Sequence, residues 1–82
     1  MQNVERLISV FKKDDHALVD EINVDHLGFE KLRSVFNPSD DDKEMYDVYP
    51  INSTKASQLE GLVDIKFDFN TYIYQLDCFA KK

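Results

Sequence analysis

The sequence contains one cysteine, Cys78, and only two glycines and two prolines. A single cysteine cannot form a disulfide within the chain, which excludes the small secreted scaffolds that disulfides hold together. The scarcity of glycine and proline argues against long disordered segments. No apolar run approaches the roughly 20 residues of a membrane-spanning helix, and the first residues lack the features of a signal peptide. The sequence therefore predicts a cytosolic protein.

Basic residues are also few: 10 lysines and arginines stand against 16 acidic residues, giving a net charge of −6. They do not cluster as phosphate binding requires, which argues against a nucleic acid or an anionic membrane as partner. The acidic excess is concentrated in NPSDDDKEMYDVYP (residues 37–50), which holds five acids and one lysine. We call residues 37–50 the acidic segment. A basic partner would complement it electrostatically.

The first part of the chain has the pattern of a β-hairpin. Apolar residues fall on both parities of residues 4–12, and on one parity of residues 17–24, so each range is predicted to be a strand. The polar residues 13–16 between them predict a turn. With 82 residues, the chain is long enough for one domain (residues 1–82).

Two helices and a further strand are predicted after the hairpin. Residues 26–36 carry apolar side chains at helical spacing, with Asp25 as the expected N-cap. Residues 54–63 show a second such stripe, capped by Asn52 or Ser53. The β-branched and aromatic residues of 65–79 predict a strand, with Asp68 and Asn70 as candidate positions for a break. The resulting order ββααβ predicts an α+β fold, a small antiparallel sheet with two helices packed on one face.

Catalytic residues are not evident. Cys78 and either His16 or His26 could form a nucleophile pair, but a cysteine within a strand is typical of a small buried hydrophobe. Gly28 and Gly61 are isolated within predicted helices, so no glycine-rich loop can hold a phosphate. The sequence predicts neither an enzyme nor a bound cofactor.

The acidic segment has part of the spacing of a calcium loop. Asp40, Asp42 and Glu44 would occupy positions 1, 3 and 5. Met45 stands where that loop needs glycine, and Ile51 stands where it needs its last acid. The sequence therefore predicts no metal site.

Two interpretations of the acidic segment remain open: a solvated loop or a surface that recognises a basic partner. Tyrosines between the carboxylates favour recognition, because tyrosine is enriched at interfaces. A second stripe, made of Tyr72, Tyr74 and Leu76, lies on one face of the last strand. If the helices cover the opposite face, which carries Ile73, the tyrosines would face outward as a contact surface. Otherwise their rings belong to the core. The predicted partner-binding residues are Asp40, Asp41, Asp42, Glu44, Tyr46, Asp47, Tyr49, Tyr72 and Tyr74.

Four stretches follow one another along the chain: VFKKDDHALVDEINV, LRSVFNP, DDDKEMYDVYPI and FDFNTYIYQLDCF. With the small size and the acidity, they resemble the small immunity proteins of bacterial toxin–immunity systems, in particular those of contact-dependent growth inhibition. The resemblance spans nearly all of the chain. It implies a cytoplasmic protein that binds and neutralises the C-terminal domain of a cognate toxin, which is often a basic nuclease acting on tRNA.

A different class of function is the alternative. The chain could be an acidic adaptor, or a regulatory protein that forms a homodimer through an exposed strand edge and has no toxin partner. The aromatic residues of the last strand would then contribute to self-association.

Overall fold

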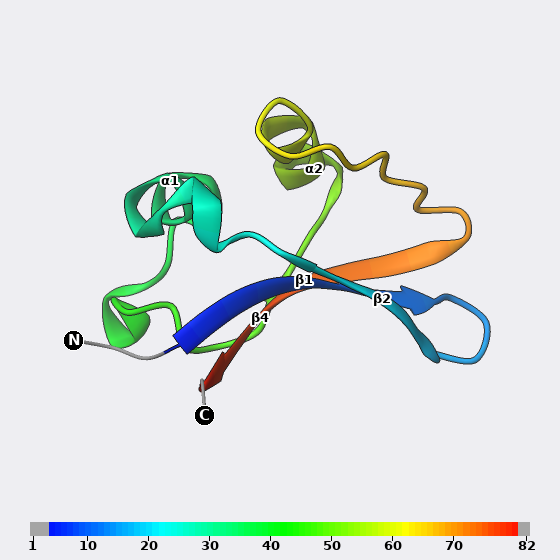
Figure 1. Cartoon of the computed structure of the whole chain (residues 1–82), viewed down its shortest axis with the longest axis horizontal. Coiled ribbons are helices and arrows are strands. Elements are labelled where there is room, and N and C mark those ends of the chain that lie inside the picture. The colour runs from blue at the N-terminus through cyan, green and yellow to red at the C-terminus, as the bar shows by residue number, and fades with distance from the viewer. Residues whose placement is uncertain (1–3, 81–82) are drawn as a thin grey trace.

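Four strands form one antiparallel sheet in the computed structural model, which describes residues 4–80 (Figure 1). Their order across the sheet is β2-β1-β4-β3. The strands are β1 (Val4–Lys12), β2 (Leu18–Asn23), β3 (Tyr49–Pro50) and β4 (Tyr72–Ala80). The helices are α1 (Phe29–Phe36) and α2 (Ser53–Glu60), with short 3-10 turns η1 (Asp25–Leu27) and η2 (Asp40–Asp42).

The predicted α+β class is confirmed, and the predicted order ββααβ is corrected. The order is β1, β2, α1, β3, α2, β4, because Tyr49 and Pro50 add a short strand between the helices. They pair with Leu76 and Gln75, at the edge of the sheet. Two residues are too few to show the alternation that marks a strand in a sequence. The strand predicted over residues 65–79 begins only at Tyr72.

The first predicted helix is shorter than its apolar stripe indicated. Gly28, at φ 83°, separates η1 from α1, and α1 has no side-chain cap. The expected N-cap, Asp25, instead accepts a hydrogen bond from the backbone N–H of Arg6 at 3.0 Å. A contact to a neighbouring strand has therefore replaced the local cap.

Of the two residues predicted to cap the second helix, Asn52 and Ser53, the structure shows Asn52 as the N-cap. The Asn52 side chain accepts the backbone N–H of Lys55 at 2.9 Å, and α2 ends at Glu60. Beyond it, the N–H groups of Leu62 and Val63 both bond to the carbonyl of Leu59. A turn thus replaces the last residues of the predicted helix.

Both helices lie on the same side of the sheet (Figure 1). The register places the buried side chains of Ile8 and Val10 opposite Leu76 and Tyr74, on the side that the helices cover. These residues join Leu32 of α1 and the apolar residues of α2 in one core. Neither helix in the described part of the chain is long and apolar enough to cross a bilayer.

The opposite side of the sheet is covered by neither helix, and we call it the open face (Figure 1). Alternation along the paired strands assigns it the odd-numbered residues of β1 and β4, together with their partners on β2. Its members are Glu5, Leu7, Ser9, Phe11, Ile73, Gln75, Asp77, Phe79, Leu18, Glu21 and Asn23.

Candidate functional site in the acidic segment

The acidic segment leaves α1 abruptly. Asn37 adopts a left-handed conformation (φ 49°), and its N–H bonds to the carbonyl of Arg33 at 2.8 Å, which ends the helix. Pro38 follows and cannot continue a helix. The chain then forms η2 and runs to β3, at the end of the molecule opposite the β1–β2 turn (Figure 1).

Asp42 organises the turn that follows η2. Its carboxylate accepts the backbone N–H of Tyr46 at 2.8 Å and that of Asp47 at 3.1 Å. It also accepts a hydrogen bond from the Tyr49 hydroxyl. Three donors thus converge on the carboxylate of Asp42, which stabilises the turn from within the segment.

Two residues anchor the segment to the body of the protein. Met45 has a left-handed backbone (φ 57°) and a completely buried side chain (0% exposed) that belongs to the core. The guanidinium of Arg6 donates from Nη2 to the carbonyl oxygen of Glu44 at 2.6 Å and lies 5.1 Å from the ring centroid of Phe29. The backbone at residues 44–45 is therefore held from both the core and β1.

The Asp42–Tyr49 pair shifts the titration of both groups. The hydrogen bond from Tyr49 is the largest cause that lowers the pKa of Asp42 below its ordinary value of 3.8. The backbone N–H groups of Tyr46 and Asp47 and the charge of Arg6 act in the same direction, while burial opposes them. Burial, followed by the bond to Asp42, raises the pKa of Tyr49 from 10.0 to about 12.

These shifts predict how stability depends on pH. The raised pKa of Tyr49 means that folding favours the neutral phenol, so its contribution is present below pH 10 and is lost as the pH rises from 10.0 to about 12. The lowered pKa of Asp42 gives a contribution that is lost as the pH falls through the acidic range. We expect Tyr49→Phe to reduce the alkaline slope, measured by urea denaturation at several pH values. Tyr46→Phe, an exposed control, should keep the wild-type slope, and equal slopes in both variants would contradict the assignment.

Four carboxylates of the segment remain directed to solvent. They are accompanied by exposed Tyr46 and Val48. No ion pair within residues 4–80 involves any of these carboxylates. The four residues are Asp40, Asp41, Glu44 and Asp47.

The described residues contain no group of three His, Cys, Asp or Glu side chains placed to hold a metal ion. Cys78 is half-buried on the helix-covered side of β4, and burial raises the pKa of its thiol. His16 lies in the β1–β2 turn and His26 in η1, both exposed. The acidic segment therefore presents charged side chains and the ring of Tyr46 to solvent.

The expectation of an outward stripe of Tyr72 and Tyr74 is corrected. Their face is the one that the helices cover, and Ile73 lies on the open face. Tyr74 is only 4% exposed: its ring packs edge-on against Phe67 at 4.7 Å, and its hydroxyl oxygen accepts the N–H of Asp68 at 2.9 Å. Tyr72 is half-buried beside it. Tyr74 is thus a core residue, as the alternative interpretation held.

The structural roles of Arg6 and Met45, which hold the acidic segment in place, were not predicted from the sequence. Arg6 shares the parity of Ile8 and Val10, so a basic residue in an apolar strand stripe was the available signal. Met45 offered none, because its burial depends on the turn built around Asp42.

Comparison with known proteins identifies a family but no function. No curated protein and no solved structure shows a significant match. Residues 5–77 match a family described as Domain of unknown function (DUF7683), which covers most of the chain. The protein therefore belongs to the DUF7683 family.

Proposed function

We propose that this protein is an immunity protein that binds a basic toxin domain in the cytoplasm and neutralises it. The observation that supports the proposal is that the carboxylates of the acidic segment have two different roles. The carboxylate of Asp42 accepts hydrogen bonds from within the segment. The other carboxylates face solvent, on a backbone that Met45 and Arg6 hold in place. They belong to Asp40, Asp41, Glu44 and Asp47. A merely solubilising loop does not need this internal support.

A fixed backbone lowers the cost of binding. Ordering a flexible loop at an interface opposes association, whereas a segment already held in one conformation avoids much of that cost. The exposed carboxylates would accelerate encounter with a basic surface, and Tyr46 would supply contact area beside them.

The toxin is proposed to be a nuclease, for example one acting on tRNA. A nuclease must attract phosphates, so the surface around its active site carries lysine and arginine. Carboxylates held on a rigid turn can occupy such a surface or block access to it. The resemblance to contact-dependent growth inhibition immunity proteins points to the same class of partner.

The alternative of a homodimer through a strand edge has one supporting observation. The strand predicted to pair, β4, lies between β1 and β3, but Leu18 and Val19 are exposed on β2, which is an edge strand. However, Asp20 and Glu21 follow directly, and antiparallel self-pairing would bring these acids of two copies close together. Sedimentation of the purified protein at micromolar concentration distinguishes a monomer from such a dimer.

The proposal predicts a defined partner and a charge-dependent association rate. Tagged protein is purified from cells carrying its neighbouring genes, and we expect one basic polypeptide to be retained in equal amount. Neutralising the four exposed carboxylates should slow association with that polypeptide about 10- to 100-fold, most strongly at low salt. The variant is Asp40→Asn, Asp41→Asn, Glu44→Gln and Asp47→Asn.

A matched variant controls for net charge. It neutralises four exposed carboxylates outside the acidic segment, and its association rate should stay within about threefold of wild type. If both variants slow association equally, the acidic segment has no special role, and if no basic polypeptide is retained, the toxin-binding function is wrong. The control is Asp14→Asn, Asp20→Asn, Glu60→Gln and Asp64→Asn.

A further inference from the structure

The open face carries large apolar side chains that no helix covers. Phe79 is 44% exposed and Ile73 is 37% exposed, although both lie in the regular strand β4. Leu18 is exposed in the same row as Phe11 and Ile73, and Leu7 and Phe11 are half-buried on the same face. Large exposed apolar side chains gathered on one uncovered face of a small protein indicate a place where another molecule binds.

The apolar residues surround a polar centre. The register sets Phe11 opposite Ile73 at one end of the face and Leu7 opposite Asp77 toward the other. Between them, Ser9 lies opposite Gln75. The open face thus has an apolar end at Phe11 and Ile73, a polar centre, and a second end where Leu7 and Phe79 lie opposite Asp77 and Glu5.

Asp77 is a desolvated carboxylate with only neutral donors. It is 7% exposed and accepts the Ser9 hydroxyl at 2.5 Å and the Gln75 side-chain amide at 3.0 and 3.2 Å. No ion pair within residues 4–80 involves it. Carboxylates this buried usually have a cationic partner, because burial removes the water that stabilises the charge.

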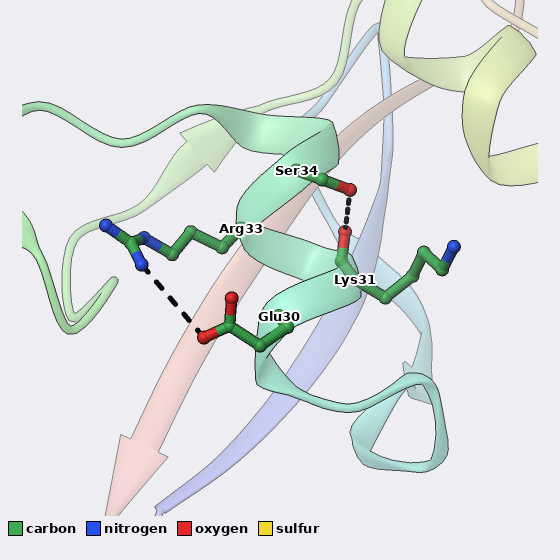
Figure 2. A network of polar contacts seen from close by, with 4 residues as sticks. All are labelled: Glu30, Lys31, Arg33 and Ser34. Carbon is green, nitrogen blue, oxygen red and sulfur yellow. Dashed lines mark hydrogen bonds and ion pairs between the residues drawn. The ribbon is translucent and has the colours of Figure 1, made fainter.

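The lysine and arginine side chains of the described strands lie away from the open face, although His16 of the β1–β2 turn lines a hollow there with Phe11, Ile73 and Gln75. Arg6 and Lys12 are the only basic residues in the strands as described over residues 4–80, and both have the parity of the helix-covered side. On that same side, α1 directs Lys31 and Arg33 outward, with Arg33 4.0 Å from Glu30 (Figure 2). The ionisable side chains of the described strands on the open face are all acids: Glu5, Glu21 and Asp77.

We infer that the open face is a docking surface for a basic amphipathic helix of another protein. A helix would add the missing third layer on the uncovered side of the sheet, as α1 and α2 do on the other side. Its apolar stripe would cover Phe79 and Ile73, and lysine or arginine beside the stripe would pair with Asp77. A second copy of this chain fits less well, because face-to-face pairing would oppose acids to acids. The inference does not require that the partner be a toxin.

The experiment uses two synthetic probes on the intact protein. One is a leucine–lysine peptide whose leucines repeat at helical spacing, and the other is a scrambled peptide of the same composition. Binding is followed by NMR chemical shifts of the labelled protein. We expect the helical peptide to shift amides of β1 and β4, and the scrambled peptide to bind at least about tenfold more weakly.

Variants then locate the contact. Ile73→Ser with Phe79→Ser, both at exposed positions, should weaken the helical peptide about tenfold or more, and Asp77→Asn should weaken it while keeping the size of the side chain. Tyr46→Ser removes an exposed aromatic from the acidic segment and should leave the affinity unchanged. The variant that neutralises Asp40, Asp41, Glu44 and Asp47 should still show the peptide-induced shifts on β1 and β4. The two proposals can therefore fail independently of each other.

Three results would overturn the inference. Equal affinity of the helical and scrambled peptides would show attraction by charge alone. Shifts confined to the acidic segment or to β2 would place the contact elsewhere. Self-association in sedimentation, abolished by Ile73→Ser with Phe79→Ser, would assign the open face to a second copy of the chain.

Discussion

Met45→Ala is expected to lower the free energy of unfolding by about 3 kcal/mol, within the range for truncating a buried methionine. The side chain is completely buried and packs in the same core as both helices. It is also the point at which the acidic segment enters that core, so its loss should release residues 40–48 as well. Urea denaturation measures the first effect, and hydrogen exchange of the amides of Tyr46 and Asp47 measures the second.

A glycine variant separates the contribution of the Met45 side chain to stability from the cost of its backbone conformation. Met45 has a left-handed φ of 57°, a region that costs residues with a Cβ about 1 kcal/mol relative to glycine. Met45→Gly should therefore be more stable than Met45→Ala, the reverse of the usual order within a helix or a strand. Tyr46→Ala, at an exposed neighbouring position, should change stability by less than about 0.5 kcal/mol. A loss of that small size for Met45→Ala would show that the segment is not anchored there.

Arg6→Met is expected to lower the free energy of unfolding by about 2 kcal/mol. The variant keeps an unbranched side chain on the helix-covered side but removes the charge-assisted bond to the Glu44 carbonyl and the contact with the Phe29 ring. The loss is partly offset, because Arg6 Nε is buried with no hydrogen-bond partner in the described structure. The pKa of Asp42 should also rise, since the charge of Arg6 helps to lower it.

Lys12→Met is the matched control for Arg6→Met. Lys12 lies on the same strand with the same parity but is exposed, so its replacement should change stability by less than about 0.5 kcal/mol. If Arg6→Met is neutral or stabilising, the cost of burying the guanidinium exceeds what its contacts return. The acidic segment would then be held by Met45 and Asp42 alone.

Most elements were predictable because their patterns are local. Residues 4–12 carry apolar side chains on both parities, residues 17–24 carry them on one, and Asn52 caps α2 through a neighbour three residues away. The cap at Asp25 was predicted wrongly, because a strand distant in sequence supplied a competing donor, the N–H of Arg6. Such competition between local and long-range partners is invisible in a single sequence.

The choice of the buried face of β4 was also beyond the sequence. Both parities of the strand are apolar: Tyr74 and Leu76 on one, Ile73 and Phe79 on the other. Alternation shows which residues share a face but not which face the helices cover. In the acidic segment, the composition identified the carboxylates, whereas the separate role of Asp42 depends on the turn that brings Tyr49 back to it.

The placement of β1 beside β4 has a consequence for the timing of folding. These strands pair from Val4 with Ala80 to Lys12 with Tyr72, so the centre of the sheet joins the two ends of the described chain. Such non-local pairing cannot begin on the ribosome until β4 has been synthesised, and it slows folding. Arg6, which holds the acidic segment, lies within this pairing. In a nascent chain the carboxylates of the acidic segment are therefore synthesised early, but they reach their final arrangement only after β4 joins the sheet.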